Sequence, residues 1–131
     1  MDYSVARKKA FRLLSMRTYH STVLFRKLEE KGCSKEVCEK VIQDCKRLGF
    51  LKDDEVILSL HRRGYGPRYI EFKLRLPRQE VRALITRSMQ KEKVLELKSK
   101  LGSKEKAMRT LQRKGFDLDI VIEIFSYQGV D

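Results

Sequence analysis

Apolar residues recur at helical spacing along almost the whole chain. Residues three or four positions apart lie on one face of an α-helix, so each such run predicts an amphipathic helix. No segment shows the sustained alternation of apolar and polar residues that is typical of a strand. The positions that mark the successive helices are Ala6, Ala10, Leu13 and Leu14; Leu24 and Leu28; Val37, Val41, Cys45 and Leu48; Val56, Ile57 and Leu60; Ile70 and Leu74; Val81, Leu84, Ile85 and Met89; Val94, Leu97 and Leu101; Ala107 and Leu111; and Ile120, Val121, Ile124 and Phe125. We therefore expect an all-α protein of nine short helices.

Polar and conformationally special residues place the ends of several of these helices. Ser34 is expected to cap the third helix, since its hydroxyl can accept a hydrogen bond from a free backbone N–H. A glycine directly after the last turn, as at Gly32, favours a left-handed cap that ends a helix. Pro67 and Pro77 suit the start of a helix, because a proline there loses no hydrogen bond. The segment from Pro77 to Met89 is predicted to form one helix.

One spacing pattern recurs along the chain. The pattern Leu-x-x-Lys-Gly occupies positions 28–32 and again 111–115, and the apolar positions of the following helix recur in the same register. Together with a looser copy between them, this recurrence indicates three tandem three-helix units, at 1–50, 51–90 and 91–131. Such small units bury little surface alone, so they are expected to pack on their neighbours in an elongated or bent array. We expect a monomer.

Positive charge dominates the composition. The 131 residues include 30 Lys and Arg against 18 Asp and Glu, which gives a net charge of +12. A surplus of this size indicates polyanionic partners such as nucleic acids, or acidic protein surfaces. Asp117, Asp119, Glu123 and Asp131 make the C-terminal end acidic, so the positive potential belongs to the first two units. We expect DNA binding that is weak, sequence-tolerant and steeply dependent on salt.

The apolar stretches are too short for a membrane protein. The longest aliphatic runs, at 56–58 and 120–122, fall far short of the roughly 18–20 residues that span a bilayer. No apolar stretch follows the N-terminal charges as it does in a signal peptide. We expect no membrane contact and a cytoplasmic location. Cys33, Cys38 and Cys45 lie in one short stretch, where burial as small apolar side chains is favoured over a redox or metal role.

The sequence contains no pattern typical of a catalytic, cofactor or metal site. His20 precedes a helix and fits capping better than catalysis, and His61 adjoins two arginines, which makes it a poor acid. The carboxylates at 53–55 could hold a metal ion, but a helix N-terminus explains them more simply. The glycines at 64–66 are too few for a phosphate-binding loop. We expect no catalytic residue, no cofactor and no metal.

The segment 61–87 concentrates basic residues, with seven arginines and one lysine against two glutamates. Arginine suits bidentate contacts with phosphate or carboxylate. On the first helix of this segment, Arg68, Phe72 and Arg75 fall on one face, and Ile70 and Leu74 fall on the opposite face, which is predicted to be buried. The candidate binding residues are Arg62, Arg63, Arg68, Phe72, Lys73, Arg75, Arg78 and Arg82.

Two alternatives stay open for this surface. Phe72 is either an exposed anchor for a partner or a packing residue against a neighbouring unit, with the arginines around it forming a solvated basic face. Lys8, Lys9 and Arg12 form a second basic cluster, which is either solvated or a secondary binding patch.

Motifs spread over the whole chain, from about Ala6 to Phe125, resemble those of one family. They are Leu24-x-x-x-Leu28-x-x-Lys31-Gly32, Gly49-Phe50-Leu51-Lys52-Asp53, Arg63-Gly64-Tyr65-Gly66-Pro67 and Arg113-Lys114-Gly115-Phe116. In order and spacing the chain resembles RecX, the bacterial regulatory protein of the RecA recombinase.

The resemblance implies a small α-helical modulator of homologous recombination and DNA repair. Such a modulator lies in the groove of the RecA–DNA filament and inhibits its ATPase and strand exchange, so the RecA filament is the implied partner. A direct DNA binder is the main alternative, because three-helix units can resemble helix-turn-helix modules. An enzyme or enzyme subunit is a third, for which the sequence indicates no reaction.

Overall fold

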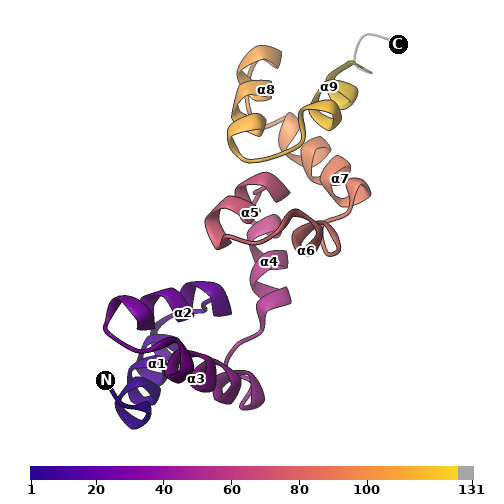
Figure 1. Ribbon diagram of the computed structural model, residues 1–131. Helices are drawn as coiled ribbons and strands as arrows, with labels where there is room; N and C mark the ends of the chain where they lie inside the picture. The colour runs from indigo at the N-terminus through magenta and orange to yellow at the C-terminus, as the bar shows by residue number, and fades with distance from the viewer. Residues whose placement is uncertain (127–131) are drawn as a thin grey trace. The chain divides into compact units, whose positions relative to one another are not determined.

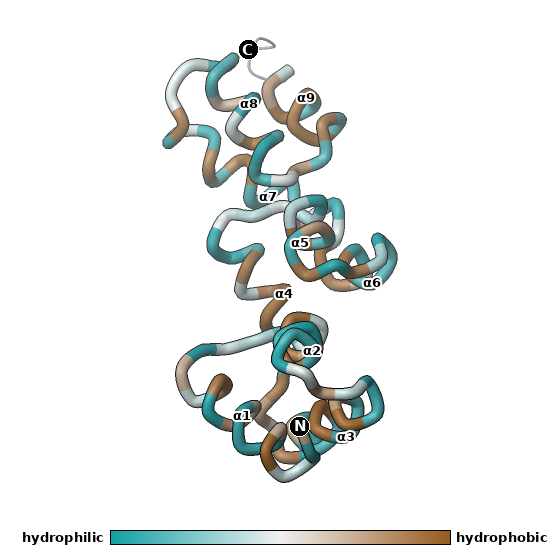
Figure 2. Tube along the Cα trace, turned by 60° about the vertical axis from the view of Figure 1, so that its left-hand side comes forward, coloured by the Kyte–Doolittle hydropathy of each residue, from teal (hydrophilic) through white to brown (hydrophobic). Residues whose placement is uncertain are grey.

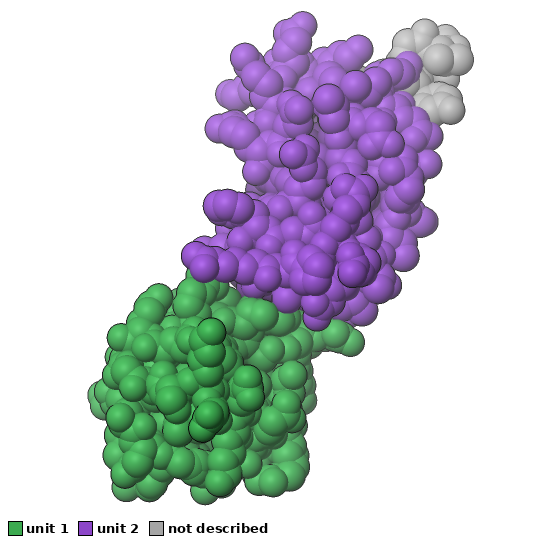
Figure 3. Space-filling model, viewed as in Figure 1, with its two compact units in different colours: residues 1–56 green, residues 57–131 purple. Residues whose placement is uncertain are grey.

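The computed structural model describes residues 1–126, which form nine α-helices and no β-strand (Figure 1). The prediction of an all-α protein is confirmed. The chain divides into two compact units, Met1–Val56 and Ile57–Asp131 (Figure 3). The division into three units at 1–50, 51–90 and 91–131 stays a prediction, and the last five of those residues, with Asp131 of the acidic end, lie outside the described part.

The first unit surrounds one apolar core. Its helices are α1 (Tyr3–Met16), α2 (Ser21–Glu30) and α3 (Lys35–Arg47), and α4 (Asp53–Arg62) begins in it. Each of the first three helices contacts the other two. Ala6 and Ala10 of α1 are fully buried against Leu24 and Leu28 of α2 and Val41 of α3. Small side chains at these α1 positions let the neighbouring backbones approach closely.

Two side chains predicted to be structural fix the start of α2. The ring Nδ1 of His20 accepts a hydrogen bond from the backbone N–H of Thr22 at 3.1 Å, which confirms that His20 is a helix cap. Asp53, the first residue of α4, accepts hydrogen bonds from the backbone N–H of Ser21 at 2.8 Å and from the Ser21 hydroxyl. The acidic residue that ends the Gly-Phe-Leu-Lys-Asp motif therefore holds two helix starts together.

The second unit contains the remaining helices. They are α5 (Pro67–Leu74), α6 (Arg78–Arg82), α7 (Arg87–Lys98), α8 (Lys104–Arg113) and α9 (Leu118–Ser126). α9 contacts both α7 and α8, and α5 contacts α6. The core under α7–α9 is formed by Val94, Ala107, Leu111, Phe116, Ile120, Val121, Ile124 and Phe125. The high apolar content of α9, largely brown in Figure 2, follows from its position against two helices.

The single helix predicted from Pro77 to Met89 is wrong. α6 ends at Arg82, and a new helix begins at Arg87. Thr86 accounts for the interruption, because its hydroxyl accepts a hydrogen bond from the backbone N–H of Met89 at 3.2 Å and so caps α7. The apolar spacing continues across the break, which is why periodicity alone did not separate the two helices.

Helix bounds agree with the repeat in the sequence. α2 spans residues 21–30 and α8 spans residues 104–113, so both ends are offset by 83 residues. The start of α9, at residue 118, is offset by the same 83 residues from the start of α3, at residue 35. Gly32 and Gly115, at equivalent places after α2 and α8, have φ of +100° and +96°. Glycine adopts this left-handed conformation without steric cost, as the sequence predicted for these helix ends.

Candidate functional site

Two glycines bring the start of α5 against the end of α8. The backbone N–H of Gly66 donates to the carbonyl oxygen of Lys114 at 2.8 Å, and the N–H of Arg68 donates to that of Gly115 at 3.0 Å. A Cβ atom at Gly66 would lie 2.5 Å from the carbonyl carbon and oxygen of Gly115. At Gly115, a Cβ atom would collide with the backbone of Tyr69. The Arg-Gly-Tyr-Gly-Pro motif at 63–67 and the Arg-Lys-Gly-Phe motif at 113–116 therefore meet in the folded chain. Only glycine at positions 66 and 115 permits this close approach.

The contact creates an open groove between α5 and α8. The groove has a volume of about 920 Å³. Arg68, Tyr69 and Phe72 line it from α5. Lys106, Arg109, Gln112 and Arg113 of α8 line it as well, with Gly115. We call this the α5–α8 groove.

Charge in the α5–α8 groove has one sign. Its lining includes four cationic side chains and no acidic one: Arg68, Lys106, Arg109 and Arg113. None of the four forms an ion pair with a carboxylate among residues 1–126. The groove is therefore a site where an anion meets cations that no internal carboxylate neutralises.

The side chain of Phe72 is exposed and is not a packing residue. Its side chain is 85% exposed, while Ile70 and Leu74 on the opposite face of α5 are buried. The predicted burial of these two aliphatic residues is confirmed. The exposed ring therefore lies beside cations that no carboxylate neutralises.

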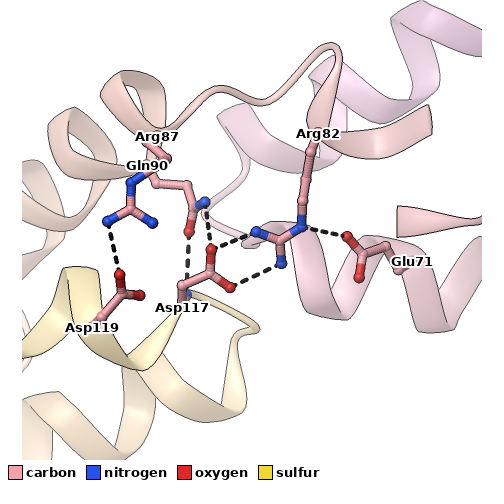
Figure 4. A network of polar contacts seen from close by, with 6 residues as sticks. All are labelled: Glu71, Arg82, Arg87, Gln90, Asp117 and Asp119. Atoms are coloured by element: carbon pink, nitrogen blue, oxygen red, sulfur yellow. Dashed lines mark hydrogen bonds and ion pairs between the residues drawn. The ribbon is translucent and has the colours of Figure 1, made fainter. Parts of the chain in front are cut away.

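Arg82 does not belong to the exposed basic surface. Its guanidinium donates two hydrogen bonds to the carboxylate of Asp117, at 2.5 and 2.9 Å, and one to Glu71 at 3.0 Å (Figure 4). Gln90 completes the network, since its amide donates to Asp117 and accepts from the Asp117 backbone N–H. Arg82 therefore ties α6 to the turn between α8 and α9, and its assignment as a binding residue is corrected.

The same network perturbs the titration of its members. Hydrogen bonds from Arg82 hold the pKa of Asp117 below its ordinary value, and the bonds to Asp117 raise the pKa of Arg82. Asp119 also has a lowered pKa, because it accepts a hydrogen bond from Arg87. The Asp117–Arg82 pair is mostly buried, whereas the Asp119–Arg87 pair is more than half exposed. Removal of one partner is therefore expected to be costly only in the first pair, where the remaining charge would stay desolvated.

Arg75 does not share the face of Arg68 and Phe72. α5 ends at Leu74, and Arg75 follows as the helix cap with φ of +55°, in the left-handed region. The predicted spacing assumed that the helix continues through Arg75, one residue beyond its end. The cap ends that spacing, and Arg75 is absent from the lining of the groove.

The remaining predicted residues lie outside the groove. Arg62, Arg63, Lys73 and Arg78 are exposed, and the Arg63 guanidinium lies 6.0 Å from the ring of Tyr65. In the first unit, Lys8 and Arg12 of α1 are exposed and Lys9 is half-buried. Their assignment as binding residues stays a prediction.

Sequence reasoning missed the α8 side of the groove. Lys106, Arg109 and Arg113 lie on the face of α8 opposite the buried Ala107 and Leu111, so their spacing already indicated an exposed basic stripe. Nothing in that spacing shows which helix lies beside it. The glycine motifs that join α5 to α8 carry no sign in the sequence that they meet.

Among residues 1–126, no group of three His, Cys, Asp or Glu side chains is arranged to hold a metal ion. Cys33, Cys38 and Cys45 are buried free thiols, as predicted. Burial raises the pKa of Cys38 to about 11 and also raises the pKa of Cys45, so neither thiol ionises readily. The nitrogens of the buried His61 ring face the carbonyl oxygens of Tyr65 and Met89.

None of the helices within residues 1–126 is long and apolar enough to cross a membrane.

Solved structures share this fold. A RecX from Lactobacillus salivarius superposes with a TM-score of 0.69 at 21% sequence identity, over 98% of this chain and 97% of that protein. The structure of a regulatory protein RecX superposes with a TM-score of 0.65 at 19% identity, over 95% of this chain and 73% of that one. No family model and no curated protein matches the sequence. The fold is that of RecX proteins, as the motifs predicted.

Proposed function

We propose that this chain is a RecX-like regulator that binds the RecA–DNA filament and inhibits RecA's ATPase and strand exchange, without catalysis of its own. The RecX fold along almost the whole chain supports the choice of partner. The net charge of +12 supports it too, because a protein–DNA filament presents phosphates and acidic side chains.

The α5–α8 groove is the observation that carries the proposal. It combines four uncompensated cations with the exposed ring of Phe72. Exposed ion pairs contribute only about 0–1 kcal/mol each, whereas an aromatic anchor flanked by arginines can form a hot spot of about 2 kcal/mol or more. The groove offers both, so it is the strongest candidate for the contact with the filament.

The charge variant of the groove should lose inhibition. We expect Arg68→Ala with Arg109→Ala to weaken inhibition of RecA's DNA-dependent ATPase several-fold, measured at fixed salt over a titration of the chain. Both side chains are exposed, so the melting temperature should not change. Ile70→Ala, at a fully buried position, should instead lower the melting temperature.

Lys8→Ala with Arg12→Ala is the matched control, because it removes the same charge from α1 of the first unit. If the groove variant inhibits RecA as well as the parent does, and the α1 variant inhibits it less, the contact with the filament lies at the secondary patch of Lys8, Lys9 and Arg12.

Direct DNA binding is the second candidate, and the uncompensated charge of the groove favours it. Binding of this kind needs no RecA and weakens steeply with salt, because each phosphate contact releases condensed counterions. Tight binding to DNA alone, with no effect on RecA, would support this function over the first.

A further inference from the structure

The cations of the α5–α8 groove are arranged for a ligand with several negative charges. Lys106, Arg109 and Arg113 follow one another along α8, and Arg68 projects from α5. Successive cations along one helix match a chain of phosphates better than a single small anion. Arginine also offers planar donor pairs for phosphate oxygens.

The aromatic side chains of the groove add a second requirement. Phe72 presents a largely bare ring, and Tyr69, one turn earlier on α5, lines the same groove. The ring of Tyr69 stacks on that of Tyr65 at 4.2 Å between centroids, which fixes its position. A flat base attached to a chain of phosphates would meet both the cations and the free ring.

Unpaired nucleotides have this chemistry and base pairs do not. In a duplex each base is stacked on its neighbours, so its face is not available to a protein ring, whereas single-stranded bases stack readily on aromatic side chains. The groove volume, about 920 Å³, lies within the range of small-ligand pockets, about 300–1,000 Å³. The groove therefore has room for an unstacked nucleotide.

We infer that the α5–α8 groove binds single-stranded nucleic acid, with an unpaired base stacked on Phe72 and the neighbouring phosphates held by Arg68, Lys106, Arg109 and Arg113. This inference rests on the proposed function, because it assigns a ligand to the groove that the proposed function uses. It also adds to the proposed function, because it gives the protein a preference for single strands over duplexes.

The first test removes the ring and keeps an apolar side chain. Binding of a short labelled thymidine oligonucleotide is followed by fluorescence anisotropy for the parent and for Phe72→Leu. Loss of one stacked base is expected to weaken binding roughly 5- to 150-fold, the equivalent of about 1–3 kcal/mol. Phe50→Leu makes the same change at another exposed phenylalanine, in the first unit, and should bind as the parent does.

Matched probes distinguish contacts with the base from contacts with the phosphates. An abasic oligonucleotide of the same length keeps every phosphate, so Phe72→Leu should bind it as tightly as the parent does. A duplex of the same length should also bind both proteins equally, and more weakly than the single strand binds the parent. An effect of Phe72→Leu that is the same on all three probes would overturn the stacking of a base.

Salt dependence tests the phosphate contacts independently. Four contacts with a single strand predict a slope of log affinity against log salt of roughly −3, since each contributes about −0.7. Arg68→Ala with Arg109→Ala should reduce this slope by about half, while Phe72→Leu should leave it unchanged. If the slope is the same for the charge variant and for the parent, the phosphates do not contact Arg68 and Arg109.

Two outcomes distinguish this inference from the proposed function. If polyglutamate displaces the oligonucleotide and Phe72→Leu has no effect on any DNA probe, the groove is a surface for acidic protein and the inference is wrong, even where RecA is inhibited. If Phe72→Leu weakens single-strand binding but the parent leaves RecA's ATPase unchanged, the inference stands and the proposed function fails.

Discussion

Gly66→Ala is expected to cost at least about 3 kcal/mol of stability and to lower the midpoint of thermal unfolding by roughly 10 °C or more. The added Cβ atom would lie 2.5 Å from the Gly115 carbonyl and from the Phe116 nitrogen. These are backbone atoms, which cannot rotate away as the end of a side chain can. Gly66 has an ordinary φ of −89°, so the cost comes from the contact and not from the conformation of the residue.

Gly32→Ala is the control for Gly66→Ala. Position 32 has a left-handed φ of +100° but no atom within 4 Å of an added Cβ, so the change should cost only about 1–2 kcal/mol. Gly66→Ala should also weaken single-strand binding, because it separates Arg68 and Phe72 from the α8 side of the groove. Thermal unfolding by circular dichroism of both variants checks the prediction. Equal midpoints would contradict the close approach of α5 and α8.

Asp117→Asn is expected to destabilise the protein by about 2–3 kcal/mol. The substitution keeps the size of the side chain but leaves the guanidinium of Arg82, 17% exposed, with Glu71 as its remaining carboxylate partner. Removal of one partner from a mostly buried pair is costly, because the other charge stays desolvated. Asp119→Asn makes the same change two residues away at an exposed pair and should melt close to the parent. If both variants melt alike, the network around Arg82 does not hold the second unit.

The effect of Asp117→Asn should also depend on pH. The pKa of Asp117 is lower in the folded chain than its ordinary value near 4. Its contribution to stability is therefore fully present above that ordinary value and is lost as the pH falls through the folded pKa. The difference in melting temperature between the parent and Asp117→Asn should be largest near neutral pH and shrink below about pH 4. A difference that grows in acid would contradict the depressed pKa.

Periodicity and helix punctuation predict most of the fold. The buried positions of α5, Ile70 and Leu74, follow from spacing alone, and so does the register shared by α2 and α8. The break at Thr86 does not, because an apolar spacing that continues through a turn cannot reveal the cap that interrupts it. Local patterns predict which face of a helix is buried, but not always where the helix ends.

The α5–α8 groove is only half predictable, for a different reason. The pairing of Arg68 with Phe72 depends on helical geometry within α5, which the sequence contains. The contribution of α8 depends on two glycines 49 positions apart, at 66 and 115, that meet only in the folded chain. Arg82 shows the opposite error, since charge alone assigns it to the surface while Asp117 and Glu71 hold it inside the unit.

The most direct test of the proposed regulation is a titration of the parent chain into preformed RecA–DNA filaments, with ATP hydrolysis followed at fixed salt. We expect hydrolysis to fall as the chain is added, and to fall less at each concentration with Arg68→Ala and Arg109→Ala combined. Unchanged hydrolysis, at concentrations where the chain is shown by co-sedimentation to be bound to the filament, would contradict regulation of RecA.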